Sequence, residues 1–151
     1  MVNLHISDKF QDSVDTTALE KAALVTLAIQ NIREDVNLSV VIEDEQQLQA
    51  LNHEFLGVDS PTDVLSFFED ELDPETGQRY LGEVIISYPQ AEKQGVAAGH
   101  STRSELDLLV VHGVLHLLGY DHSTDEEKEK MWKIQTEILL ELGTDIKKYP
   151  E

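Results

Sequence analysis

The chain of 151 residues contains no cysteine. Disulfide bonds and thiolate metal clusters are therefore excluded, and any metal ion has to be held by histidine, aspartate or glutamate. Basic residues are also scarce, because 11 lysines and arginines stand against 30 aspartates and glutamates, for a net charge of −19. Phosphate groups are normally bound by lysine and arginine, so the composition alone argues against a nucleic-acid ligand.

Long apolar segments are missing as well. No run approaches the length that spans a bilayer, and the first seven residues lack the basic and apolar stretches of a secretion signal. We therefore expect a cytoplasmic protein that does not contact membranes. Hydrophobic residues make up 40% of the chain and charged residues 27%, close to the averages of globular proteins. Without repeats or linkers, the chain is expected to form a single domain over residues 1–151.

Periodicity in the sequence predicts the secondary structure. Alternating or continuous apolar residues predict strands at 2–7, 37–42, 62–68 and 81–87. Helical spacing predicts helices at 15–32, 43–55, 88–98 and 103–119, and a last helix from the cap at Ser123 to about Leu142. The acidic segment 69–80 is expected to be an exposed, mobile connection, across which its two flanking strands could pair antiparallel. These elements predict an α/β (α+β) fold, a compact domain with a small mixed four-stranded sheet and about five helices.

Two capping boxes mark the expected starts of the last two helices. These are Thr102-x-x-Glu105 and Ser123-x-x-Glu126. The first predicts a helix that begins near Arg103 and ends at Gly119, and its surface is mostly apolar: Leu106, Leu109, Val110, Val114 and Leu117. A helix that is apolar on most sides is normally buried. We therefore expect this helix to be central in the fold and to hold its polar side chains in fixed positions.

That helix carries a candidate metal site. His112 and His116 lie four residues apart, so both rings leave the same helix face, and Gly119 can adopt the left-handed conformation that ends a helix. A short loop can then bring His122 back to the same point. Three neutral imidazoles leave one tetrahedral position open, as in catalytic zinc sites. We predict one Zn²⁺ per chain, although another divalent metal is possible.

The histidine spacing is that of the metzincin peptidases, H-E-x-x-H-x-x-G-x-x-H. Gly113, however, occupies the position of the glutamate that serves as the peptidase base. The metal-binding half of the motif is thus present and the peptidase half is missing. A metallopeptidase-like zinc hydrolase remains an alternative.

Polar residues near these motifs are candidates for the chemistry. Asp63 and Asp121 could each act as general base or hold a histidine in one tautomer, and the second role is favoured for Asp121. Thr62 and Ser66 are candidates for a substrate groove, since they interrupt an otherwise apolar strand. For Asp63 the alternative is ordinary turn chemistry, in which its carboxylate accepts hydrogen bonds from nearby backbone N–H groups.

Two longer motifs resemble a known family. Pro61-Thr-Asp-Val-Leu-Ser-Phe67 and His112-Gly-Val-Leu-His-Leu-Leu-Gly-Tyr-Asp-His122 are similar to signatures of the YbeY family of bacterial endoribonucleases. Leu51-Asn52 and Leu81-Gly-Glu-Val-Ile-Ile-Ser87 extend the similarity. The resemblance implies a metal ion on His112, His116 and His122. It also implies single-strand-specific RNA cleavage in ribosome maturation and quality control, with ribosomal RNA and the small ribosomal subunit as partners.

One position departs from the family pattern. The family arginine that follows the aromatic residue of L-N-x-x-[YF]-R is Leu56 here, after Phe55. A cation that could hold phosphate is absent from that place, and its role could pass to Arg79, Arg103 or a nearby lysine. The sequence leaves open whether the nucleophile is water or the RNA 2′-hydroxyl. A third alternative is a ribosome-associated metal-binding protein with weakened catalysis.

Overall fold

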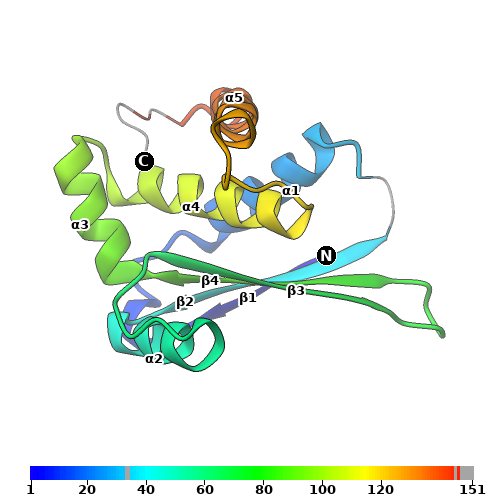
Figure 1. The fold of residues 1–151 in the computed structure, drawn as a ribbon, viewed down its shortest axis with the longest axis horizontal. Helices are drawn as coiled ribbons and strands as arrows, with labels where there is room; N and C mark the ends of the chain where they lie inside the picture. Colours follow the sequence, from blue (N-terminus) through cyan, green and yellow to red (C-terminus); the bar gives the residue numbers. More distant parts are fainter. Residues whose placement is uncertain (33–34, 145, 147–151) are drawn as a thin grey trace.

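Strands and helices alternate along most of the chain in the computed structural model, which describes residues 1–32, 35–144 and 146 (Figure 1). The elements are β1 (Val2–Ile6), α1 (Thr16–Ile29), β2 (Val36–Glu43), α2 (Glu45–Leu56), β3 (Val64–Leu72), β4 (Arg79–Ser87), α3 (Tyr88–Ala98), α4 (Thr102–Leu117) and α5 (Asp125–Leu142). A short 3₁₀ helix, Asp8–Phe10, follows β1. The four strands and five α-helices confirm the predicted fold class.

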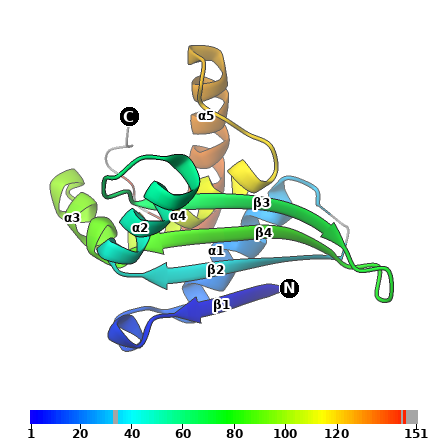
Figure 2. The same ribbon diagram turned by 60° about the horizontal axis from the view of Figure 1, so that its bottom comes forward.

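The strands form one mixed sheet in the order β1-β2-β4-β3. β1, β2 and β4 run parallel, and β3 pairs antiparallel with β4, as expected for two strands joined by a hairpin (Figure 2). Parallel strands buried on both faces have near-continuous apolar sequences, and β2, with the sequence VNLSVVIE, follows this pattern. The mixed, four-stranded sheet predicted from the sequence is confirmed.

Helices cover both faces of the sheet. α1 and α4 lie on one face, α2 lies on the other, and α5 packs over α4 on the side away from the sheet (Figure 1). α4 is therefore buried from two sides: Leu109, Val110 and Val114 belong to the core against the sheet, and Leu108, Val111 and Leu115 to the core with α5. The predicted central, buried helix is confirmed. None of the helices described in the structure is long and apolar enough to cross a membrane.

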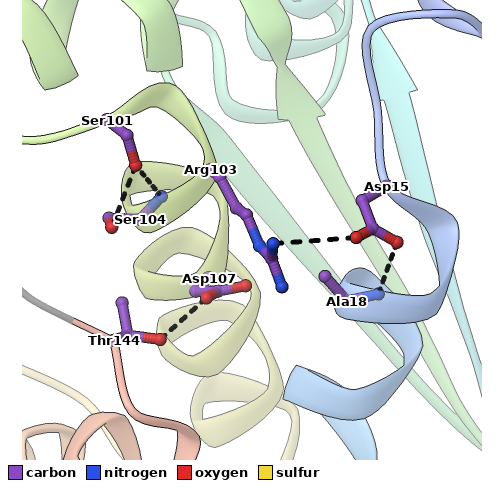
Figure 3. Close-up of polar contacts among 7 residues, drawn as sticks. All are labelled: Asp15, Ala18, Ser101, Arg103, Ser104, Asp107 and Thr144. Atoms are coloured by element: carbon purple, nitrogen blue, oxygen red, sulfur yellow. Dashed lines mark hydrogen bonds and ion pairs between the residues drawn. The ribbon is translucent and has the colours of Figure 1, made fainter.

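Both predicted capping boxes are wrong by one residue. Ser101, not Thr102, caps α4, because its extended backbone lets its hydroxyl oxygen accept a hydrogen bond from the Ser104 N–H (Figure 3). Glu105 is not available for a box, since its carboxylate lies 2.7 Å from the His100 ring and both side chains are almost fully buried. Likewise Thr124, not Ser123, caps α5. Adjacent serine and threonine residues offer equivalent caps, and the backbone conformation decides between them.

Residues 69–77 are exposed, as predicted for the segment 69–80, but residues 78–80 are half-buried and the segment is not an irregular connection. β3 continues to Leu72 and β4 begins at Arg79, so the two strands form a long hairpin that projects beyond the helices (Figure 2). The turn is closed by a 2.8 Å hydrogen bond from the Asp73 N–H to the Gln78 carbonyl. An ion pair joins Arg79 to Asp70 across the strands. Strand pairing thus continues through a sequence whose acidic composition predicts a loop.

Polar side chains lock the start of α4 to its neighbours (Figure 3). Arg103 lies 3.8 Å from the Asp15 carboxylate, which also caps α1 by accepting the Ala18 N–H. One turn further along α4, Asp107 accepts a 2.8 Å hydrogen bond from the Thr144 hydroxyl. Burial raises the pKa of the Asp107 carboxyl. These contacts fix both α1 and the end of α5 against the helix that carries the histidines.

Candidate metal centre

The three predicted histidines meet at the end of α4. His112 and His116 lie in its last two turns, and the helix stops at Leu117, after which Gly119 takes a left-handed φ of 101°. The following loop returns His122 to the same place, so that one ring nitrogen of each histidine lies within 4.8 Å of the others. The Nε2 atoms of His112 and His116 are 3.0 Å apart. This cluster could hold a metal ion.

The protein environment keeps two of these rings neutral. Burial, helped by the neighbouring His116 and His122 rings, lowers the pKa of His112 to about 4. The pKa of His116 is also lowered, again mainly by burial. A metal ion competes with protons for the same nitrogen lone pairs. His112 therefore offers its lone pair at neutral pH without first losing a proton, and the nitrogen donor set suits zinc.

Gln135 orients His112, and sequence reasoning missed it. This residue of α5 is fully buried, and its Oε1 atom lies 2.6 Å from the His112 Nδ1 atom. An amide oxygen only accepts hydrogen bonds, so the His112 Nδ1 carries the proton and its Nε2 is left for the metal side. The signal in the sequence is a polar residue four positions after Met131, on the stripe of α5 that faces the core.

Replacing Gln135 with leucine, which has a similar size, is expected to weaken zinc binding about 10- to 100-fold, because the His112 tautomer is no longer selected. Gln135→Glu is the matched control, since a carboxylate also accepts the Nδ1–H. Competition with a chromophoric chelator measures the affinity, and thermal unfolding of the metal-free proteins checks the fold. Equal zinc affinity of the leucine variant and the wild type would show that Gln135 only fills space.

The two candidate carboxylates have different surroundings. Asp63, just before β3, lines a cavity of about 200 Å³ together with His112 and His122. Asp121 accepts hydrogen bonds of 2.8 Å from both the His122 N–H and the Ser123 hydroxyl. These contacts, the Ser123 bond foremost, lower the pKa of Asp121. Asp121 therefore shapes the loop that presents His122, whereas Asp63 lines the cavity beside His112 and His122.

Thr62 and Ser66 are placed differently from Asp63. The Ser66 hydroxyl donates a 3.1 Å hydrogen bond to the Gly113 carbonyl, which ties β3 to α4 beside the first metal-site histidine. Thr62 is half-buried in the segment that precedes β3. Neither residue is among those that line the cavity. Their role as a substrate groove stays a prediction.

Gly113 faces the sheet rather than the histidine cluster. A Cβ atom at this position would lie 2.4 Å from Cγ1 of Val84, a fully buried residue of β4. The helix therefore approaches the sheet more closely here than any larger residue allows. The position that holds the catalytic glutamate in the metzincin motif is used for packing in this protein.

Arg79 and Arg103, the two arginines that could replace the cation missing at Leu56, are not among the residues that line the cavity. Leu56 ends α2, the helix on the opposite face of the sheet from α4. Arg79 pairs with Asp70 in the hairpin, and Arg103 with Asp15 at the start of α4. Within the described part of the chain, the basic residue that lines the cavity is Lys128 of α5.

Comparison with known proteins gives consistent matches over the length of the chain. The family model described as Endoribonuclease YbeY matches residues 4–143. A protein of Roseiflexus castenholzii named Endoribonuclease YbeY is 39% identical over 144 residues, which cover 93% of this chain and 91% of that protein. A protein of Dehalococcoides mccartyi with the same name is 43% identical over 133 residues, covering 80% and 77%. The solution structure of a Thermotoga maritima protein is similar at a TM-score of 0.59 and 28% identity, covering 93% and 91%.

Proposed function

This chain belongs to the YbeY family of endoribonucleases, and we propose that it cleaves single-stranded RNA with a zinc ion held by His112, His116 and His122. The observation that carries the proposal is the convergence of three ring nitrogens, two of them on half-buried, neutral rings, at a cavity wide enough for part of a nucleotide. When bound, such an ion lowers the pKa of a water molecule and polarises a phosphoryl oxygen.

The residues around the cavity then have separate tasks. Gln135 keeps the proton of His112 on Nδ1, and Asp121 holds the loop of His122. We assign to Asp63 the role of general base, which accepts a proton from the attacking water or 2′-hydroxyl, because its carboxylate lines the cavity beside the histidines. Leu108 and Leu109 give the cavity an apolar wall. A partly apolar wall strengthens the electrostatic interactions inside the cavity.

The natural substrate we propose is the RNA of the small ribosomal subunit. The support is the resemblance of the two long motifs to the family that matures ribosomal RNA, together with the family match over nearly the whole chain. This substrate would place the protein in the cytoplasm. Binding to small-subunit particles, measured by co-sedimentation, tests this part of the proposal separately from cleavage.

A cleavage assay tests the proposed function. We expect zinc-loaded protein to cut a single-stranded ribosomal RNA fragment and to leave the same sequence intact in a duplex. Treatment with a chelator should stop the cleavage. A 2′,3′-cyclic phosphate at the new end would identify the 2′-hydroxyl as nucleophile, and its absence from the earliest products would identify water. Chelator-sensitive degradation of casein without RNA cleavage would instead support the peptidase alternative. Binding to the small subunit without cleavage would support a protein with weakened catalysis.

A further inference from the structure

One end of α5 completes the cavity beside the histidines. The cavity is lined by residues that precede or begin β3, by α4 and by α5: Asp63, Val64, Leu108, Leu109, His112, His122, Lys128 and Trp132. Lys128 and Trp132 lie four residues apart, so they share one face of α5. The helix that orients His112 through Gln135 thus also supplies a cation and an aromatic ring to the same cavity.

Lys128 is held at the cavity without a carboxylate partner. Its Nζ atom lies 4.6 Å from the centre of the Trp132 ring, a cation–π contact that fixes a partly buried side chain. In the described residues no aspartate or glutamate forms an ion pair with Lys128, whereas Lys9, Lys93 and Arg103 each have one. Glu127 and Glu129 leave the helix in other directions and do not line the cavity. The charge of Lys128 is therefore available to an anion.

We propose that Lys128 binds a non-bridging oxygen of the phosphodiester group that is cleaved at the histidines; this inference rests on the proposed function. His112, His122 and Lys128 line the same cavity of about 200 Å³, which has room for one phosphodiester group with part of its ribose. The lysine offsets negative charge in a protein whose net charge is −19. It also stabilises the additional charge that develops on the phosphoryl oxygens during cleavage.

The test compares Lys128→Ala with Lys128→Arg and Lys130→Ala. Lys130→Ala is the matched control, because it removes the same charge from the same helix. The Lys130 Nζ atom lies 5.8 Å from the centre of the Tyr120 ring, and Lys130 does not line the cavity. We expect Lys128→Ala to lower kcat/KM for single-stranded RNA about 10- to 100-fold, a smaller loss than for a fully enclosed donor because the site is open to solvent. Lys128→Arg retains most of the activity, and Lys130→Ala is unchanged within about twofold.

Trp132 supplies a second measurement that does not depend on cleavage. It is the one tryptophan of the chain, so its fluorescence reports on the cavity alone. Titration with a 2′-O-methyl oligoribonucleotide, checked by electrophoresis to stay uncut, is expected to change the emission. For Lys128→Ala we expect weaker binding of the oligonucleotide. The slope of log K against log salt concentration should be less steep by about 0.7, the value for one phosphate contact on a single strand.

The possible outcomes separate this inference from the proposed function. Equal cleavage rates and equal oligonucleotide affinities for wild type and Lys128→Ala overturn the role of Lys128. If neither protein cleaves RNA but the difference in affinity remains, the proposed function is wrong and the phosphate contact stands. A change in zinc content or in the unfolding temperature of Lys128→Ala would show a structural role and would also contradict the inference.

Discussion

Replacing His116 with alanine is expected to abolish both zinc retention and RNA cleavage. The His116 ring is the middle member of the cluster, with its centre 4.6 Å from that of His112 and 5.0 Å from that of His122. Two imidazoles that remain from different segments of the chain cannot hold zinc in competition with buffer and water. The loss in affinity should exceed the roughly 10- to 100-fold that follows removal of an outer hydrogen-bond partner, because a ligand itself is missing.

The measurement is the zinc content of protein purified without added metal, together with the cleavage rate on single-stranded RNA. His53→Ala is the matched control, since His53 is also a helical histidine but is exposed on α2, the helix on the opposite face of the sheet. We expect the control to retain one zinc ion and full activity. Full cleavage by metal-free His116→Ala protein would contradict the metal-dependent mechanism.

Replacing Gly113 with glutamate is expected to unfold or strongly destabilise the protein rather than to create a peptidase. The substitution restores the sequence of the metzincin motif, but the new Cβ atom would lie 2.4 and 3.0 Å from the two methyl carbons of Val84. Val84 is β-branched and fully buried, so it cannot turn aside. Overpacking of this kind costs about 1–3 kcal/mol. Burial of an unpaired carboxylate adds several more.

Gly113→Ala isolates the packing part of this effect. Alanine favours a helix over glycine by about 1 kcal/mol, so a net loss of stability in urea unfolding would show that the clash with Val84 dominates. Combining Gly113→Ala with Val84→Ala makes room for the new methyl group. The double variant should therefore be more stable than the sum of the single changes predicts. If Gly113→Glu were as stable as the wild type and degraded casein, the position would face the metal and our placement of it would be wrong.

Much of this structure can be predicted from the sequence because the signals are local and periodic. The spacing of His112 and His116 on one helix face, with Gly119 to reverse the chain, predicts a cluster that the structure brings together. The apolar surface of α4 predicts its central place, and the hairpin-connected strands predict the antiparallel edge of the sheet. In each case the pattern repeats over several residues, so no single residue decides the result.

What could not be predicted depends on tertiary partners. Gln135 is one polar residue within a helical stripe, and nothing in its neighbours indicates that a histidine 23 positions earlier faces it. Glu105 fits a capping box by spacing, yet the buried His100 ring binds its carboxylate instead. Gly113 can be read as the loss of a catalytic base, but its closeness to Val84 shows a packing requirement. The assignments of Gln135 and Gly113 need the position of a second segment that lies far away in the sequence.

The acidic hairpin disfavours the approach of RNA to one end of the molecule. Five exposed carboxylates, those of Glu69, Asp70, Glu71, Asp73 and Glu75, project with β3 and β4 beyond the helices (Figure 2). They repel a polyanion that approaches this end of the molecule. Such fields act over a Debye length of about 8 Å at physiological salt. Collisions of RNA with the hairpin are thus disfavoured, so the association rate depends on the orientation of the encounter.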